Sequence, residues 1–240
     1  MTSENQQAPA AMLLAAGFGK RMRPLTDRLP KPLIPVLGKP LIEYALAHLA
    51  AAGIQRVVIN LAYRGDQIRD HLGNGDRWGL QIQYSEEHEP LETAGGITQA
   101  LPLLGDAPFL VVNGDVWCDF DFKHWIDNPL PESCPGRLLM VPNPPHNPEG
   151  DFGIEGGIEG EADSGLLSGT AKPRFTYAGI SWLRPEILTT YPHARDCYGL
   201  GEVFTHNEDL MQAEVYRGDW CDVGTPERLS KLEERLRSDV

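Results

Sequence analysis

A group of cationic side chains near the start of the chain could bind a small anion. The stretch MLLAAGFGKRMRPLTDRLPKPLIPV begins as an apolar run and then carries one acid, Asp27, among the cations Lys20, Arg21, Arg23, Arg28 and Lys31. The chain as a whole has a formal net charge of −13. A small anionic ligand needs only a local positive pocket, so we expect these cations to bind such a ligand.

The two glycines that precede the cations predict a loop that approaches its ligand closely. Residues 11–15 form a short apolar run typical of a buried strand, and Gly17 and Gly19 follow its carboxyl end. Glycine lets the backbone turn and point its N–H groups at a phosphate. The loop lacks the G-x-x-x-x-G-K-[ST] pattern of P-loop NTPases, and Met22 stands where the Rossmann fingerprint needs a third glycine. We therefore expect a phosphate-binding loop of neither kind.

Lys31 stands between two prolines, Pro30 and Pro32. Because proline restricts its own backbone and that of the residue before it, this arrangement predicts an extended backbone that holds the lysine in place. A fixed lysine suits a task of charge placement. A solvated basic loop is the alternative, but the glycines, the prolines and the acidic remainder of the chain favour the chemical role.

Length and composition are typical of a globular protein. The chain has 240 residues, of which 41% are hydrophobic and 23% charged, enough to bury a core without disulfides. The four cysteines are scattered, which disfavours zinc and a disulfide framework and suits a reducing cytoplasm. No apolar stretch predicts a membrane span, and the acidic balance disfavours nucleic acid. Residues 1–10 are polar and are expected to be a disordered lead, with residues 11–240 as a single domain.

Strand-like and helix-like segments alternate in the first half of the chain, which predicts parallel strands joined by helical crossovers. The second half predicts shorter strands, a glycine-rich hairpin over residues 152–168 and a last helix capped by Thr225. The fold class expected is α/β, with a Rossmann-like, mixed and mostly parallel sheet flanked by helices and a small antiparallel subregion. The expected strands span residues 11–15, 56–61, 80–84, 109–113, 137–141, 175–183 and 213–217, and the expected helices span residues 40–52, 66–72, 93–104 and 186–191.

The segment LAAGFGKRMRPLTDRLPKPLIPVLGKPLIEY resembles the signature of the sugar-1-phosphate nucleotidyltransferases over about thirty contiguous positions. Their pattern reads L-A-A-G-x-G-x-R-[ML]-x-P-L-T, then P-K-P-[LM]-x-P-[VI]. Members have a GT-A-like fold, transfer a nucleotide from a nucleoside triphosphate to a sugar 1-phosphate, and release pyrophosphate. The resemblance implies that Arg21 and Lys31 place positive charge around the reacting phosphates. The residues that it implies hold the triphosphate are Ala15, Ala16, Gly17, Gly19, Lys20, Arg21 and Lys31.

Two aspartates resemble the metal-binding residues of that family. Asp115 follows the strand-like FLVVNG, and Asp222 stands in GDWCDVGTPERL, just before the last helix. A triphosphate substrate implies Mg²⁺, which takes one or two protein carboxylates, and the resemblance assigns it to these two catalytic residues. Each aspartate taken alone is typical of a turn or a helix cap. A D-x-D tripeptide at Asp119 and Asp121 is a competing signal, typical of glycosyltransferases, but Asp121 is expected instead to start a helix.

The segment EPLETAGGITQAL resembles the family's base-reading loop. Gly95 and Gly96 would allow close approach of the nucleobase, and the helix that follows would offer its N-terminus to anionic groups. A plain helix start, with glycine for packing, is the alternative.

The same resemblance implies residues on the sugar side of the site. Glu92 and Asn113 would reach the sugar phosphate, and Asp151 and Gly153, in GDFG, would lie across the cleft and bind the sugar. A carboxylate suits this task because sugar hydroxyls are donors. His146 lies in the neighbouring proline-rich loop, where a solvent-facing histidine is expected.

Within the family, NGDVW, GDF and WCDVGTPERL look most like the N-acetylmuramate-1-phosphate uridylyltransferases of peptidoglycan recycling. Two segments depart from those relatives. DCYGLGEVF lacks the lysine that they tend to carry near Tyr198, and the loop of residues 142–150 is longer. The resemblance therefore implies transfer of UMP from UTP to N-acetylmuramic acid α-1-phosphate, with mannose-1-phosphate guanylyl transfer or glucose-1-phosphate thymidylyl or uridylyl transfer as alternatives.

Two functions of other classes stay open. A non-catalytic sensor would bind sugar nucleotides in the same cleft, although it would not need both Asp115 and Asp222. A glycosyltransferase using Asp119 and Asp121 would release a nucleoside diphosphate. The expected partners are a nucleoside triphosphate and a sugar 1-phosphate, with no nucleic acid or membrane, and the protein is expected to be a cytoplasmic monomer.

Overall fold

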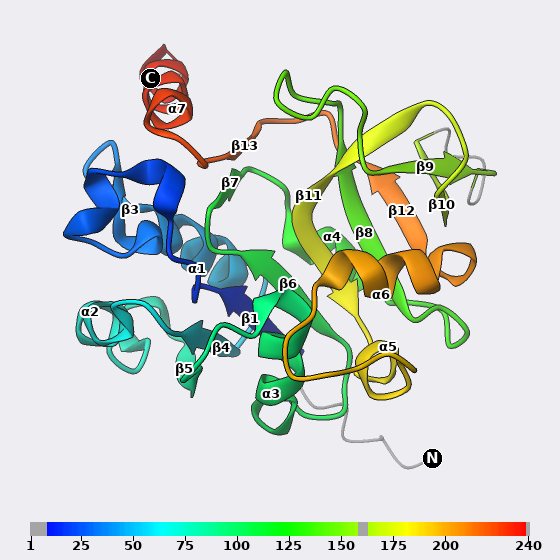
Figure 1. Ribbon diagram of the computed structural model, residues 1–240, viewed down its shortest axis with the longest axis horizontal. Coiled ribbons are helices and arrows are strands. Elements are labelled where there is room, and N and C mark those ends of the chain that lie inside the picture. Colours follow the sequence, from blue (N-terminus) through cyan, green and yellow to red (C-terminus); the bar gives the residue numbers. More distant parts are fainter. Residues whose placement is uncertain (1–8, 158–162, 239–240) are drawn as a thin grey trace.

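The computed structural model describes residues 9–157 and 163–238 and has one large mixed sheet at its centre. Nine strands follow the spatial order β5-β4-β1-β6-β11-β8-β12-β10-β9. Figure 1 shows the N-terminal strands in one half of the sheet and the later strands in the other. The chain therefore forms a continuous sheet in which the two halves meet between β6 and β11.

The first half of the sheet is parallel, as the alternating pattern predicts. Its strands are β1 (Ala10–Leu14), β4 (Arg56–Leu61), β5 (Gln81–Glu86) and β6 (Phe109–Asn113). β1 lies between β4 and β6 and pairs with both in parallel. After β1 the chain adds β4 and then β5 on one side of it, and it then crosses over to place β6 on the other side. The carboxyl ends of β1 and β6 flank this switch point, which is where α/β sheets bind ligands.

The second half is largely antiparallel, and the sheet is less parallel than expected. Only β12 and β8 pair in parallel there, so four of the eight neighbouring pairs in the sheet are parallel. The hairpin expected over residues 152–168 is confirmed by the pairing of β9 with β10, and residues 158–162 of that range lie outside the described residues. The strands are β8 (Gly136–Val141), β9 (Phe152–Glu155), β10 (Ser164–Ser168), β11 (Arg174–Leu183) and β12 (Gln212–Val215).

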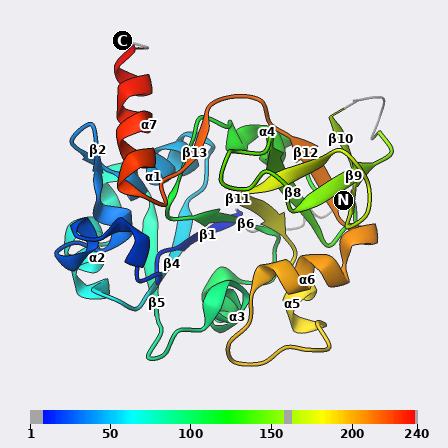
Figure 2. The ribbon, with the colours of Figure 1, turned by 45° about the horizontal axis from the view of Figure 1, so that its top comes forward.

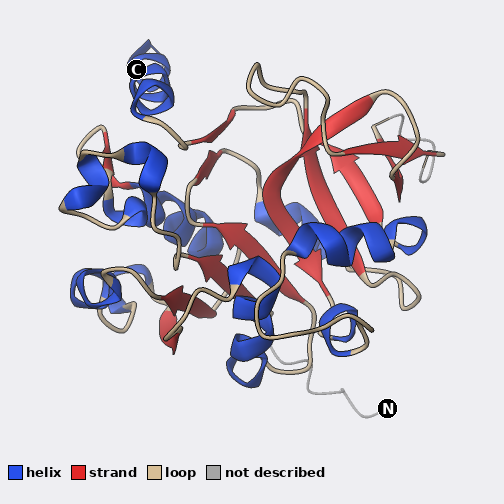
Figure 3. Cartoon of the chain, viewed as in Figure 1, coloured by secondary structure: helices blue, strands red, loops and turns tan. Residues whose placement is uncertain are grey.

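Helices cover both faces of the sheet (Figures 2 and 3). One buried cluster joins a sheet face to α1 (Leu41–Ala51), α2 (Gly65–Leu72) and α4 (Phe122–Asp127). The other joins the opposite face to α3, α5 and α6. Successive residues of β1 go to opposite clusters, because strand side chains alternate. The second group comprises α3 (Glu92–Leu104), α5 (Glu186–Thr189) and α6 (Leu200–His206).

A third, smaller cluster ties the cationic loop to the C-terminal segments. Met22 and Leu41 pack there with Trp117, Val223 and Leu232. Trp117 lies in a two-stranded ribbon beside the main sheet, which the sequence pattern did not predict. Its strands are β7 (Val116–Cys118) and β13 (Trp220–Asp222). Two further short strands, β2 (Pro35–Val36) and β3 (Lys39–Pro40), pair with each other, and the last α-helix is α7 (Pro226–Ser238).

The ends of the chain meet the expectations only in part. Ala10 belongs to β1 rather than to the expected lead, of which residues 1–8 lie outside the described residues. Thr225 caps α7 as expected, since its hydroxyl accepts a hydrogen bond from the Arg228 amide at 3.3 Å. Among the helices in residues 9–157 and 163–238, none has both the length and the apolarity needed to cross a membrane.

Candidate active site

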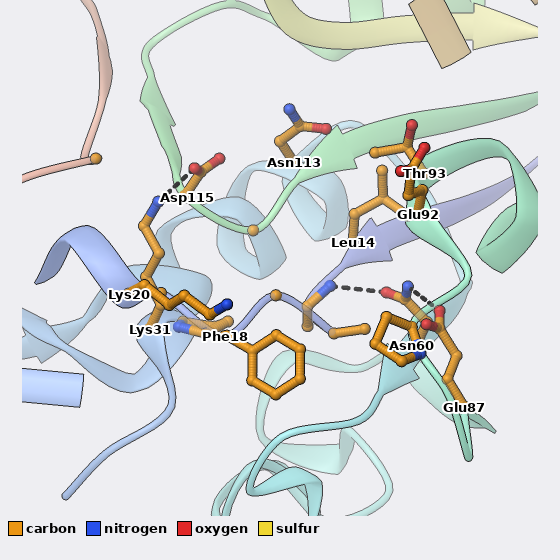
Figure 4. A pocket seen from close by; sticks show the side chains of 18 of the residues that line it. Leu14, Phe18, Lys20, Lys31, Asn60, Glu87, Glu92, Thr93, Asn113 and Asp115 are labelled. Carbon is orange, nitrogen blue, oxygen red and sulfur yellow. Dashed lines mark hydrogen bonds and ion pairs between the residues drawn. The ribbon is translucent and has the colours of Figure 1, made fainter. Parts of the chain in front are cut away.

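A cavity of about 620 Å³ opens at the switch point between β1 and β6. Figure 4 shows the side chains that gather there from the loop after β1, the end of β6 and the start of α3. We name it the first cavity. The predicted residues that line it are Ala15, Ala16, Gly17, Gly19, Lys20, Arg21, Lys31, Glu92, Asn113 and Asp115, joined by others such as Phe18, Asn60, Glu87 and Gly224.

The loop after β1 leaves a row of backbone donors unused. The amides of residues 16–20 make no hydrogen bond to any described residue. Gly19 has φ +60°, and a Cβ there would lie 2.8 Å from the Thr26 side chain. Glycine is thus required at this turn. Lys20 and Arg21 follow without a carboxylate partner within the described chain, so the loop presents N–H groups and positive charge together, as a polyphosphate requires.

The Ala15 amide is not available to a ligand, because it already donates within the chain. It donates to Asn60 Oδ1 at 2.7 Å, and Asn60 Nδ2 donates to Glu87 Oε1 at 2.6 Å. Both of these side chains are buried, and burial raises the pKa of the Glu87 carboxyl. The sequence interpretation missed Asn60 and Glu87, although each is a polar residue at or just after the carboxyl end of a strand. They hold the start of the loop rigidly.

Lys31 lies where the prediction needs it, but its backbone is not extended. Pro30 is extended, with ψ 146°, whereas residues 31–33 form a short 3₁₀ turn. The expectation of an extended Lys31 was wrong because proline at the second position of a tight turn still fits a helical φ. The lysine ammonium forms an ion pair with Asp115, and its side chain is only 12% exposed. This largely buried lysine is therefore held beside the end of β6 (Figure 4).

The glycines at the start of α3 are closely packed in this structure. A Cβ at Gly95 would lie 2.3 Å from the Asp196 carbonyl oxygen, and one at Gly96 would lie 2.5 Å from Glu87 Oε1. Neither glycine lines the first cavity. The amides of residues 94 and 95 donate to the Tyr198 carbonyl at 3.0 and 3.2 Å, so these two donors of the helix N-terminus are not free for an anion. Such close packing is what the packing alternative expects, and a role of these glycines toward the base stays a prediction.

Glu92 and Asn113 both line the first cavity, as the resemblance implies. Glu92 has φ +60°, a conformation that is strained for a residue with a side chain. Such strain recurs at functional sites. Asn113 Oδ1 is buried and has no hydrogen-bond partner among the described residues.

Asp151 and Gly153 do not face either of the two cavities that we describe. The Asp151 carboxylate accepts hydrogen bonds from the Tyr177 amide at 2.8 Å and from Asn147 Nδ2 at 3.0 Å. A Cβ at Gly153 would lie 2.1 Å from the Ala171 carbonyl oxygen. In this structure the pair therefore stabilises the packing of the antiparallel half, and their assignment to the sugar gains no support.

Of the two predicted metal ligands, Asp115 directly precedes β7 and Asp222 ends β13, and both side chains are paired with cations. Asp222 lies opposite Val116 in the β7–β13 ribbon, and the Val223 amide donates to the Asp115 carbonyl at 2.8 Å. Arg228 Nη1 contacts the Asp222 oxygens at 2.6 and 2.5 Å. Asp115 faces the first cavity, whereas Asp222 lines a second one beside it. Arg21 lines both cavities and so marks where they adjoin.

The competing D-x-D is engaged in local structure. Asp121 caps α4 by accepting from the Lys123 amide at 2.9 Å, as expected. Asp119 accepts from the Asp219 amide at 2.8 Å and from the Tyr216 hydroxyl. These bonds explain both aspartates without a metal, which removes the main support for the glycosyltransferase alternative.

Magnesium was assigned from the resemblance, and the donors present fit it. Within the described residues no group of three or more histidine, cysteine or acidic side chains forms a ready metal cluster. Mg²⁺ in phosphate-transfer sites, however, typically takes one or two carboxylates and completes its shell with substrate phosphates and water. Asp115, which lines the first cavity, and Asp222, which lines the adjoining second one, would provide that minimal set.

Comparisons with known proteins agree with this geometry. Residues 10–162 match the family described as "Nucleotidyl transferase". The chain is 45% identical over 230 residues, 93% of its length and 96% of the relative's, to the N-acetylmuramate alpha-1-phosphate uridylyltransferase of Neisseria meningitidis. It is 30% identical over 226 residues, 90% of its length and 61% of the relative's, to the mannose-1-phosphate guanylyltransferase of Mycobacterium tuberculosis.

Solved structures share the same fold. HddC from Yersinia pseudotuberculosis, complexed with GMP-PN, superposes with a TM-score of 0.76 at 25% identity, covering 95% of this chain and 99% of that one. A UDP-glucose pyrophosphorylase complexed with UDP-glucose superposes with a TM-score of 0.80 at 18% identity, covering 98% and 100% of the two chains.

Proposed function

We propose a specific reaction for this chain, which belongs to the nucleotidyl transferase family. It transfers UMP from UTP to N-acetylmuramic acid α-1-phosphate and releases pyrophosphate. The observation that carries this choice of substrates is the 45% identity, over nearly the full length of both chains, to a relative with that name. The substrates and the reaction imply the role in peptidoglycan recycling and the cytoplasmic location that the sequence led us to expect.

The reaction needs alignment and charge stabilisation rather than a general base. An oxygen of the sugar 1-phosphate, already ionised at neutral pH, forms a bond to the α-phosphorus of UTP. The bond from that phosphorus to the bridging oxygen breaks, and its electron pair leaves with pyrophosphate. Catalysis of this kind rests on positioning and on cations around the phosphates.

The residues of the first cavity divide these tasks. The free amides of residues 16–20 and the side chains of Lys20 and Arg21 bind the triphosphate. Lys31, positioned against Asp115, stabilises charge on the transferring phosphoryl group. The buried Asn60–Glu87 pair keeps the loop in register. Glu92 and Asn113, on the other side of the cavity, contact the sugar phosphate or the ribose.

Asp115 and Asp222 hold Mg²⁺ in this proposal. When bound, the ion neutralises and orients phosphate oxygens. Because both carboxylates are paired with Lys31 and Arg228 in this structure, we expect binding to require nucleotide as well as metal. Mn²⁺ titrated in the presence of an unreactive UTP analogue should bind the wild type and should bind Asp115→Asn and Asp222→Asn at least tenfold more weakly. Equal affinity in all three proteins would remove the metal from these aspartates.

A substrate panel tests the reaction and the alternatives together. UTP, dTTP, GTP and CTP are each combined with the 1-phosphates of N-acetylmuramate, glucose, N-acetylglucosamine and mannose, and pyrophosphate release is measured with Mg²⁺. We expect UTP with N-acetylmuramate 1-phosphate to give the highest kcat/KM. A preference for GTP with mannose 1-phosphate would instead make this a guanylyltransferase, and no release with any pair would favour the sensor.

A further inference from the structure

A second cavity of about 740 Å³ adjoins the first and is rich in cations. The proline-rich loop before β9 forms one wall, and β13 with the start of α7 forms the other. Three carboxylates, those of Asp219, Asp222 and Glu227, line it against five lysines and arginines, although the whole chain has a net charge of −13. The five are Arg21, Arg217, Arg228, Lys231 and Arg235. A local excess of positive charge favours an anionic group here.

Arg228 differs from its cationic neighbours in burial. Its side chain is 15% exposed, whereas those of Arg217, Lys231 and Arg235 are 42–69% exposed. The three exposed cations form surface ion pairs with Asp163, Glu227 and Asp219. Surface pairs are screened and weak, and a buried guanidinium interacts more strongly with an anion that reaches it.

The Arg228 guanidinium still has unused donors. Nη1 contacts both Asp222 oxygens and also lies 2.7 Å from His146 Nε2. Nε and Nη2 make no hydrogen bond to any described residue. Nη2 lies against Gly224, where a Cβ would be only 1.9 Å away, and Gly224 lines the first cavity. Arg228 thus lies at the boundary between the two cavities, with part of its planar fork free.

We propose that Arg228, oriented by Asp222 and His146, binds the carboxylate of the acidic sugar and so determines sugar specificity. This inference rests on the proposed function. N-acetylmuramate differs from N-acetylglucosamine by a lactyl ether that ends in a carboxylate. In this proposal the sugar phosphate lies near Asp115 in the first cavity, and the lactyl group reaches Arg228 at the boundary with the second cavity. A guanidinium fork recognises a carboxylate with two parallel hydrogen bonds, which an uncharged sugar cannot accept in the same way.

The test compares two sugar 1-phosphates that differ only in the lactyl group. We measure kcat/KM with UTP for N-acetylmuramate 1-phosphate and for N-acetylglucosamine 1-phosphate in the wild type, Arg228→Met, Arg228→Lys and Lys231→Met. Where turnover of the second sugar is too slow, its inhibition constant is used. Loss of a charged hydrogen bond predicts that Arg228→Met lowers the ratio between the two sugars by about 10- to 100-fold. Arg228→Lys, which keeps the charge, should recover part of the ratio.

Lys231→Met is the matched control, one turn further along α7, and should change the ratio less than about threefold because Lys231 is exposed. If Arg228→Met slows both sugars equally, the arginine merely neutralises Asp222, and the inference is wrong. The inference is also wrong if Arg228→Met keeps normal activity and the wild-type ratio of kcat/KM between the two sugars. If the wild type does not use N-acetylmuramate 1-phosphate at all, the proposed function fails first, and that result is distinguishable from the others.

Discussion

The sequence predicts the positions of some residues of the site, but it does not reveal residues that act through partners far away in the chain. Lys31 and Asp115 were predictable because one belongs to a contiguous signature and the other follows a buried strand and a glycine. Asn60 and Glu87 were not, because each acts through a residue far away in the chain. The ion pair of Asp222 with Arg228 was also hidden, since both residues fitted a simple helix start.

Replacing Lys31 tests the charge that it contributes. Lys31→Met keeps the aliphatic stem and removes the ammonium next to Asp115. Because a preorganised cation at a phosphoryl transfer site contributes about 3 kcal/mol or more, kcat should fall at least about 100-fold. Pyrophosphate release measures this. Lys39→Met, whose ammonium lies over the Tyr44 ring away from both cavities, is the control and should keep normal turnover. Near-normal activity of Lys31→Met would contradict the assignment.

The buried Glu87 carboxyl predicts a pH dependence of stability. Burial raises its pKa in the folded protein, so the folded state holds this proton more tightly than the unfolded state. Its contribution to the free energy of unfolding is therefore lost as pH rises from the ordinary value of 4.5 through the raised one. Glu87→Gln removes this loss. Urea unfolding should show the stability difference moving in favour of the variant between pH 4 and pH 7, and a pH-independent difference would argue against a raised pKa.

Among the helices and strands, those with a clear hydrophobic pattern were predicted well, whereas the short strands β7 and β13 and the packing at the start of α3 were not. β4 and β6 have the predicted bounds, because a run of β-branched or apolar residues between turn signals leaves few alternatives. The β7–β13 ribbon was missed because three-residue strands have almost no periodicity. The close packing of Gly95 against Asp196, about a hundred residues later, was not predicted because it leaves no signal in the local sequence.

Two helical glycines provide a matched test of that packing. In Gly95→Ala the new Cβ would overlap the Asp196 carbonyl, so we expect the free energy of unfolding to fall by about 1–3 kcal/mol. Gly201, in α6, has open space where its Cβ would lie, so Gly201→Ala should stabilise the protein by up to about 1 kcal/mol. Urea titration followed by circular dichroism measures both. Equal effects of the two substitutions would mean that α3 does not pack as described.

At the scale of the whole molecule, one continuous sheet brings the nucleotide side and the proposed sugar side into contact. The loop after β1, the end of β6 and the β7–β13 ribbon meet where the parallel and antiparallel halves adjoin. The sequence predicted a mixed sheet and an α/β class. It did not predict the share of antiparallel pairing, because strand order depends on contacts between segments far apart in sequence.

The continuous sheet predicts that the chain unfolds as one unit. Far-ultraviolet circular dichroism and tryptophan fluorescence should give the same urea midpoint, since breaking either half exposes the core of the other. Sedimentation should give the 26.5 kDa mass of a single chain, as expected for a monomer. Two separate transitions would divide residues 11–240 into more than one domain, and a doubled mass would overturn the monomer.

We propose that the loop after β1 and the two aspartates bind the same nucleotide. A crystal structure with an unreactive UTP analogue and Mg²⁺ tests it most directly. We expect phosphates against the amides of residues 16–20, the Lys31 ammonium within hydrogen-bond distance of a phosphate oxygen, and one metal ion bound by both Asp115 and Asp222. A nucleotide bound outside the first cavity, or a metal ion that touches neither aspartate, would contradict it.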